Sequence, residues 1–172
     1  MANIVLLDFS SQVKETMNDE AVAWLYTWSN EIASHAKRNC QMDGNVGVQL
    51  RGSYTTSVDT IACEAQIGST LEAAYWEEYG TGSHADTLKN GGKQGRKDWW
   101  VYVKDQPPRL TESTHYQTEA EAEAVAASMR AEGFDAYATN GRDPNYTLEN
   151  AFIATKPKAQ ADMEARLKWE FE

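Results

Sequence analysis

Residues 73–82 read Ala-Ala-Tyr-Trp-Glu-Glu-Tyr-Gly-Thr-Gly, an aromatic and acidic segment that runs directly into Gly-Thr-Gly. This pattern predicts a short helix over 71–79 that stops at Gly80, because glycine accepts left-handed backbone angles that other residues resist. The next residues, 83–97, are mostly small, basic or glycine, which predicts a surface loop. The segment supplies no convincing catalytic set.

Length, net charge and cysteine content limit the classes of protein to which this chain can belong. A chain of 172 residues is long enough for one domain with a real core. Its net charge of −10 gives no basic surface that could bind DNA phosphates. An acidic surface is instead typical of a soluble protein, of one with basic partners, or of one along which DNA passes without binding. Cys40 and Cys63 match no zinc or redox spacing, so we expect reduced thiols in a cytoplasmic product. No targeting signal or membrane span is expected.

The first third of the chain predicts a strand and a long helix. The apolar run Ile4–Phe9 is typical of a short strand. Apolar residues then recur at three- and four-residue steps over about 12–38, which predicts a helix of about 40 Å. That helix either projects as one piece or kinks near residues 18–19. Residues 48–57 are expected to begin as a helical turn and continue extended, and alternation over 58–67 predicts a strand.

The second half predicts a hairpin interrupted by a helix. Trp99–Lys104 alternates as a strand, a capping box at Thr118–Glu121 begins a helix that runs to Glu132, and Phe134–Thr139 reads as the return strand. Residues 140–144 are typical of a turn.

Thr147 is expected to cap the terminal helix, and Pro157 within it predicts a kink or two segments. The whole reads as a single α+β domain over 1–172. A long N-terminal helix and a C-terminal helix pack on a small antiparallel sheet, with a βα-type insertion at about 106–138 in one hairpin.

In this order the pieces resemble the small neck or tail-completion (head-tail joining) family of long-tailed bacteriophages, whose members are often described only as a tail component. The resemblance covers 1 to about 104 and about 139 to 172. The positions that carry it are Gly47, Leu50, Ser53, Tyr75, Glu78, Tyr79, Gly80, Thr81, Trp100, Pro144, Ala151 and Phe152. The chain departs from the family pattern at 39–43, where Asn-Cys-Gln-Met-Asp replaces a proline-valine-aspartate run.

The resemblance implies a structural virion protein that is assembled in the bacterial host cytoplasm. Its copies would form a ring, a hexamer or dodecamer, at the head-tail junction between connector proteins and the tail tube or its terminator protein. Genomic DNA would pass through the lumen without specific binding, and neither a membrane nor a cofactor is expected. The contact elements would be the long helix, the loop 80–97 and the terminal helix, with the loop ordering as the ring forms.

Two other functions remain open. A tail terminator that caps the tube would share the size, fold class and ring. Alternatively, the insertion faintly resembles the small sporulation-related fold that binds denuded peptidoglycan, which would make the chain a glycan-binding module.

The sequence does not predict an enzyme or a metal site. His35, His84 and His115 lack metal-ligand spacing, although His84 with Asp86 is the best candidate for a ligand or proton carrier. The glycine-rich run 91–97 is compatible with phosphate binding but lacks Walker spacing.

Two further features bear on assembly. Glu77 and Glu78 would point about 100° apart on a helix, so they cannot act as a carboxylate pair. We hypothesise instead that Glu78 accepts backbone donors at the turn to Thr81.

Six tryptophans are many for this length. At least one of Trp99 and Trp100 is expected outside the core as an interface anchor, unless all six are covered.

Overall fold

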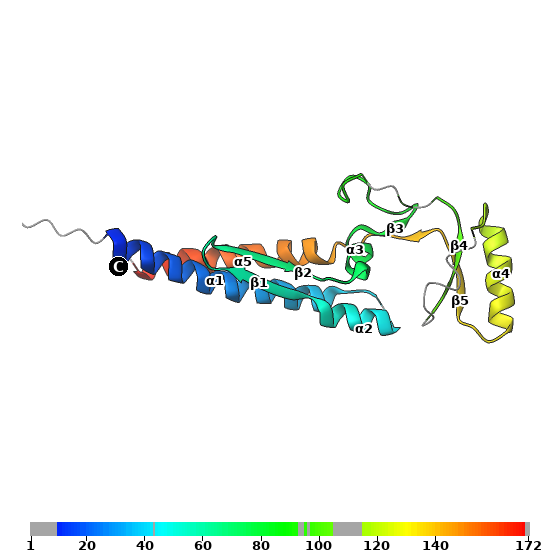
Figure 1. Ribbon diagram of the computed structural model, residues 1–172, viewed down its shortest axis with the longest axis horizontal. Coiled ribbons are helices and arrows are strands. Elements are labelled where there is room, and N and C mark those ends of the chain that lie inside the picture. The colour runs from blue at the N-terminus through cyan, green and yellow to red at the C-terminus, as the bar shows by residue number, and fades with distance from the viewer. Residues whose placement is uncertain (1–9, 43, 93–94, 96, 105–114, 171–172) are drawn as a thin grey trace, which may run out of the picture.

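The computed structural model describes residues 10–42, 44–92, 95, 97–104 and 115–170. Its frame is a pair of long antiparallel helices, α1 (Ser10–Asn39) and α5 (Thr147–Glu170), which lie side by side in Figure 1. Trp24 Nε1 donates to the carbonyl of Ala159 at 2.8 Å across this contact. α1 is one uninterrupted helix, so the kink expected as an alternative near residues 18–19 does not occur. The strand predicted over 4–9 lies outside the described residues.

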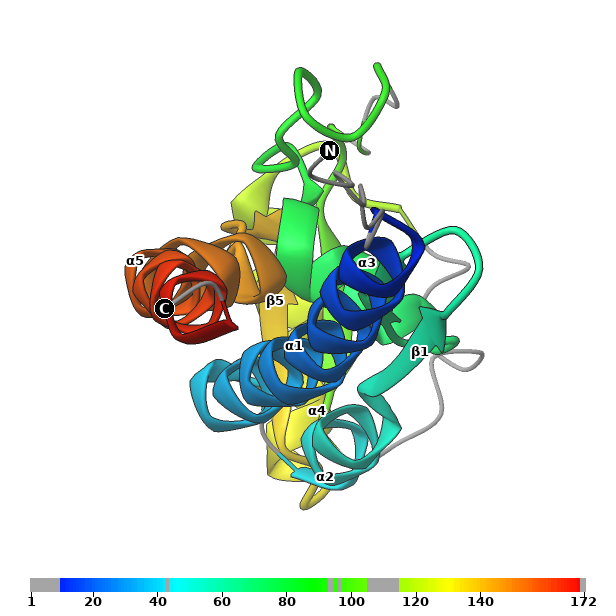
Figure 2. The same ribbon diagram turned by 90° about the vertical axis from the view of Figure 1, so that its left-hand side faces the viewer.

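A helix and a hairpin follow α1. They are α2 (Gly44–Ser53), β1 (Thr55–Asp59) and β2 (Glu64–Gly68), and the two strands pair antiparallel with Thr56 opposite Ile67. Figure 2, which looks along the long helices, shows α1 between α5 on one side and α2 with β1 on the other.

The single strand predicted over 58–67 is wrong, because the chain turns over at residues 60–63. The Asp59 carboxylate accepts the backbone N–H groups of Ile61 and Ala62, both at 2.9 Å, and closes that turn. Cys63 then takes a φ of 52°, a conformation that few side chains adopt. The helical turn predicted at the start of 48–57 is a full helix, which leaves only its last residues extended.

The helix α3 (Glu72–Tyr79) ends at Gly80, as predicted. The chain then forms β3 (Thr81–Gly82), which pairs with β6 (Gly141–Arg142). The turn predicted at 140–144 therefore contains a short strand. Between the ends of α1, α2, α3 and α5 lies the main core, formed by Ala36, Cys40, Leu50, Tyr54, Ala73, Ala74 and Ala151.

The predicted insertion lies in a unit with its own core, the distal unit, which consists of one helix and one strand pair. β4 (Trp100–Val103) pairs with β5 (Ala136–Thr139), and α4 (Glu119–Ala131) covers one face of the pair, at the end of the molecule away from the C-terminus (Figure 1). The predicted capping box at Thr118 is present. The buried residues of this second core are Val101, Val103, Ala122, Ala126 and Ala136. Residues 106–114 of the predicted insertion lie outside the described part of the chain.

The helix break predicted at Pro157 is wrong, because α5 continues through it as one helix. Pro157 is exposed, and helical residues on both sides of it, Leu148 and Ala159 among them, lie against α1. Packing of both halves on a straight neighbour outweighs the loss of one backbone hydrogen bond. The fold is α+β, as predicted, with five helices and small two-stranded antiparallel sheets in the described residues. None of the helices described here is long and apolar enough to cross a bilayer.

Candidate assembly site

Glu77 is the most deeply enclosed charged residue at the junction of the elements. Its side chain is fully buried near the end of α3. Oε1 accepts the backbone N–H of Gln41 at 2.6 Å and the side-chain amide of Asn145 at 2.9 Å. Oε2 lies 2.8 Å from Arg142 Nη1 and is held by that ion pair rather than by a hydrogen bond. A buried charge is tolerated only with such partners, so Glu77 ties together the end of α1, α3 and the segment before α5.

Glu78 holds a different part of the chain. Its two oxygens accept the backbone N–H groups of Leu148, at 2.7 Å, and Glu149, at 3.0 Å. These are orphan donors of the first turn of α5, and a carboxylate there also faces the positive end of the helix dipole. Our hypothesis that Glu78 binds donors at the turn to Thr81 is therefore wrong in its location. The acceptor role is present, but the donors lie about 70 residues later in the chain.

The glycine after α3 lets two backbones approach closely. Gly80 has a φ of 73°, and a Cβ there would lie 2.6 Å from the carbonyl oxygen of Arg142. Thr81 Oγ1 accepts the Arg142 N–H at 3.1 Å and closes the β3–β6 pair. The Gly-Thr pair therefore builds a contact between distant segments as well as a helix stop.

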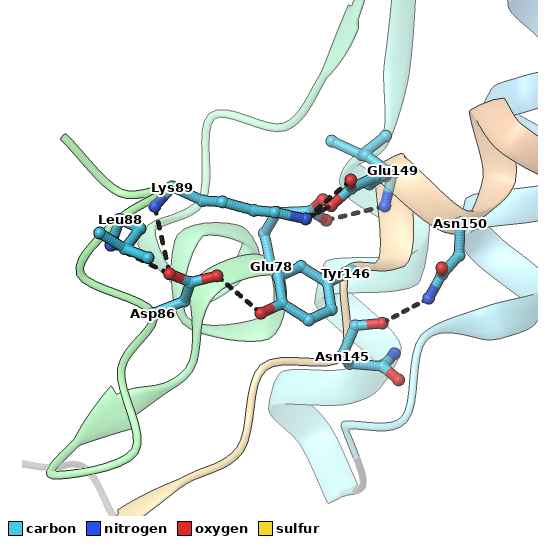
Figure 3. Close-up of polar contacts among 9 residues, drawn as sticks. Glu78, Asp86, Leu88, Lys89, Asn145, Tyr146, Glu149 and Asn150 are labelled. Atoms are coloured by element: carbon cyan, nitrogen blue, oxygen red, sulfur yellow. Dashed lines mark hydrogen bonds and ion pairs between the residues drawn. The ribbon is translucent and has the colours of Figure 1, made fainter.

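The described part of the following loop is held against the start of α5 by contacts of Asp86 and Lys89, which together form a clasp (Figure 3). The Tyr146 hydroxyl donates to Asp86 at 2.7 Å, which lowers the pKa of that carboxyl and raises the pKa of the phenol. Lys89 Nζ lies 2.6 Å from Glu149 Oε2 and 4.4 Å from the centre of the Tyr146 ring. Residues 86–89 are thus held by contacts within a single copy of the chain.

His84 does not pair with Asp86, the partner considered from the sequence. Its Nδ1 lies 2.8 Å from Asp143, and its Nε2 lies 3.1 Å from Asn140. The hydrogen bond to Asp143 is the main cause of a raised pKa at His84, and Asn140 adds to it. The described residues contain no group of His, Cys, Asp and Glu side chains that could hold a metal ion.

An apolar groove of about 780 Å³ runs between β2 and α5. Its floor is α1, with Trp24, Trp28 and Ile32. Ala65 and Ile67 of β2 form one wall, and α5 forms the other, from Leu148 to Gln160. Glu78, Lys89 and Glu149 lie at one end, so the clasp and the groove are continuous.

Most residues that carry the family resemblance meet around this junction. Gly47 is buried, and a Cβ there would lie 1.9 Å from the carbonyl oxygen of Met42. Leu50 and Ala151 are fully buried in the main core, and Ser53 Oγ lies 2.6 Å from Ser69 Oγ.

The remaining positions lie nearer the surface. Tyr75 donates to the carbonyl of Asn90 at 3.2 Å, and its ring lies 5.0 Å from that of Tyr79. Pro144 contacts Gly80, and Phe152 is half exposed on the groove. Trp100 is the exception, because β4 places it in the distal unit.

No family model, curated protein or solved structure matched this chain.

Proposed function

We propose that this chain is a structural virion protein of a tailed bacteriophage or prophage, and that its copies form a ring at the head-tail junction. The observation that supports the proposal is the convergence of the resemblance positions on one junction. Gly47 and Leu50, the segment 78–81, and Pro144 with Ala151 come from three distant parts of the chain. They pack on or around one small core, which is expected if the motif encodes a scaffold.

The use of the carboxylates also favours a scaffold. Glu77 and the motif residue Glu78 are adjacent acids near the end of α3, yet their oxygens are taken up by backbone donors and by Arg142. A general acid or base must reach a substrate proton, and these two groups face protein partners instead. The net charge of −10 suits a channel wall along which DNA slides without sticking.

The direct test is labelling of phage particles that encode this chain. Antibody-gold should mark a single position between head and tail, and mass photometry of the purified chain should show a closed ring of six or twelve copies. Absence of the chain from purified particles would contradict the proposal. Label on tails assembled without heads would instead favour the tail terminator.

A second candidate function rests on an aromatic face of the distal unit. Tyr102 and Tyr137 are cross-strand neighbours on β4 and β5, and their exposed fractions are 49% and 50%. They lie on the sheet face opposite the buried Val101 and Val103, beside the partly buried Trp100. Clustered exposed rings mark binding surfaces more often than isolated ones do. This face favours a glycan-binding module in the distal unit.

A peptidoglycan pull-down tests that candidate. Tyr102→Ala and Tyr137→Ala should each abolish retention, whereas Phe134→Ala should not, because Phe134 is exposed outside the strand pair. Equal retention of all three variants would remove this function.

A further inference from the structure

We propose that residues 4–9 of one copy of this chain dock as an added strand on β2 in the groove of a second copy. The sequence of this segment, Ile-Val-Leu-Leu-Asp-Phe, is the most strand-like apolar run of the N-terminal region. The proposal deepens the ring function above, on which it rests for its biological setting, but its test does not need a virion.

The groove adjoins an open strand edge. β2 pairs with β1 on one side, and no described residue pairs with its other side. β2 supplies groove residues and β1 supplies none, so the unpaired edge of β2 faces the groove. An open edge with free N–H and C=O groups is a template for an extended segment.

The dimensions suit one strand of this length. The α5 wall runs from Leu148 to Gln160, which is about 18 Å at the helical rise. Six residues in a strand span about 20 Å. A strand therefore fills the groove from the clasp to its far end without overhanging it by more than about one residue.

The side-chain pattern also suits the groove. In a strand, Val5, Leu7 and Phe9 lie on one face, and Ile4, Leu6 and Asp8 lie on the other. One face is thus wholly apolar and matches the floor formed by Trp24, Trp28 and Ile32. The single acid lies on the face turned away from that floor.

The same copy cannot fill its own groove with this segment. Ser10 begins α1, and Trp24 and Ile32 lie about 21 and 33 Å further along the helix. Residues 4–9 precede Ser10 directly, so even when folded straight back they reach about 20 Å. They would stop near Trp24 and leave the rest of the groove empty. A second copy has no such limit.

Docking of this kind joins two different patches, a terminal segment and a groove. Such a heterologous contact repeats from copy to copy and closes into a ring when the rotation permits. Every copy carries one groove and one N-terminal segment, so each copy can serve as acceptor and as donor.

A donor-and-acceptor mixing experiment tests the proposal. The acceptor is the full chain without residues 2–9, and the donor carries Ala65→Glu, which places a charge on the groove wall. Sedimentation velocity should show that each is monomeric alone, with self-association weakened about a hundredfold or more relative to the native chain. An equimolar mixture should form a 1:1 complex. Ile153→Asp is the matched control for the donor, because Ile153 is exposed on α5 outside the groove, and this variant should assemble like the native chain.

Circular dichroism of each variant checks that it folds, and Leu7→Asp and Phe152→Asp replace the truncation and the donor if either does not. A native chain that is monomeric, a truncated chain that still assembles, or a mixture without complex overturns strand docking. The last two results leave the virion proposal standing, because that proposal is decided by labelling of particles. A monomeric native chain would also contradict the ring expected of the purified chain.

Discussion

Adjacent residues in this protein can serve unrelated contacts. Glu77 closes a polar network among α1, α3 and β6, whereas Glu78 caps the first turn of α5. Gly80, two residues later, carries both a positive φ and a backbone approach that a methyl group would obstruct. Local chemistry at the end of α3 therefore fixes how segments from both halves of the chain meet.

Replacing Gly80 with alanine should cost several kcal/mol of unfolding free energy. Gly80 has a φ of 73° and a ψ of −178°, a combination essentially restricted to glycine, so a side chain there adds about 1–3 kcal/mol of backbone strain, and the clash with the Arg142 carbonyl adds to this. Gly91→Ala is the matched control, because Gly91 has a φ of 76° but nothing within 4 Å of its Cβ position. Urea denaturation of both variants measures the difference. Equal losses would mean that the close approach at Gly80 is unimportant.

The His84 contacts predict a pH dependence. The pKa of His84 is raised by Asp143 and Asn140, so the folded state binds the proton more tightly than the unfolded state does. The resulting stabilisation is complete below the unfolded pKa of about 6.5 and is lost as pH rises through the raised value. NMR titration should show that Asp143→Asn lowers this pKa. The two proteins should differ in stability at about pH 5.5 and converge at about pH 8.5. An unchanged His84 titration would contradict the contact.

The sequence revealed the positions of the junction but not their partners. The stop at Gly80 follows from glycine alone, and it was predicted. Arg142 and Asn145 were missed as partners of Glu77, because contacts across more than 60 residues leave no local pattern. A clue was available in Glu77 itself, since a charged residue between Trp76 and Glu78 on a core-facing helix needs a partner.

At the scale of elements, two local signals were misleading, one because of a competing local contact and the other because of tertiary packing. Alternation over 58–67 predicted one strand, but the Asp59 side chain closes a turn within it. Pro157 predicted a break, but α5 is continuous. The predictions that succeeded, α1 and α4, rested on long periodicity and on the capping box at Thr118, which are signals contained within the element itself.

Pro157→Ala should therefore stabilise the protein. The substitution restores a backbone donor within an existing helix at an exposed position, so we expect a gain of up to about 3 kcal/mol, reduced by the greater freedom of the unfolded chain. Thermal denaturation measures the change, and Lys158→Ala, also exposed, serves as the neighbouring control. A loss of stability would show that the proline is accommodated by a local deformation that alanine cannot use.

The whole molecule is organised around two separate cores. The main core lies among α1, α2, α3 and α5, and the second lies between α4 and the β4–β5 pair. The order of the elements predicted a helix between the two strands of a hairpin, and this helix and these strands form the second core. The groove between β2 and α5 was not foreseen, because it depends on how a hairpin and a helix are spaced on α1.

Two cores predict two unfolding steps. Leu50→Ala should destabilise the main body by about 2–5 kcal/mol, because Leu50 is fully buried there. Protection of the α4 and β5 amides should stay unchanged, since distant sites act independently. Hydrogen exchange followed by mass spectrometry separates the two regions. A parallel loss of protection in both would show a single cooperative unit.

The chain enters and leaves the distal unit at neighbouring points, because Trp100 lies opposite Thr139 and Gly82 lies opposite Gly141. A foreign domain whose ends are equally close can therefore be spliced in its place without rethreading the long helices. The position of the distal unit is therefore a site at which another domain can be attached, at the end of the molecule away from the C-terminus.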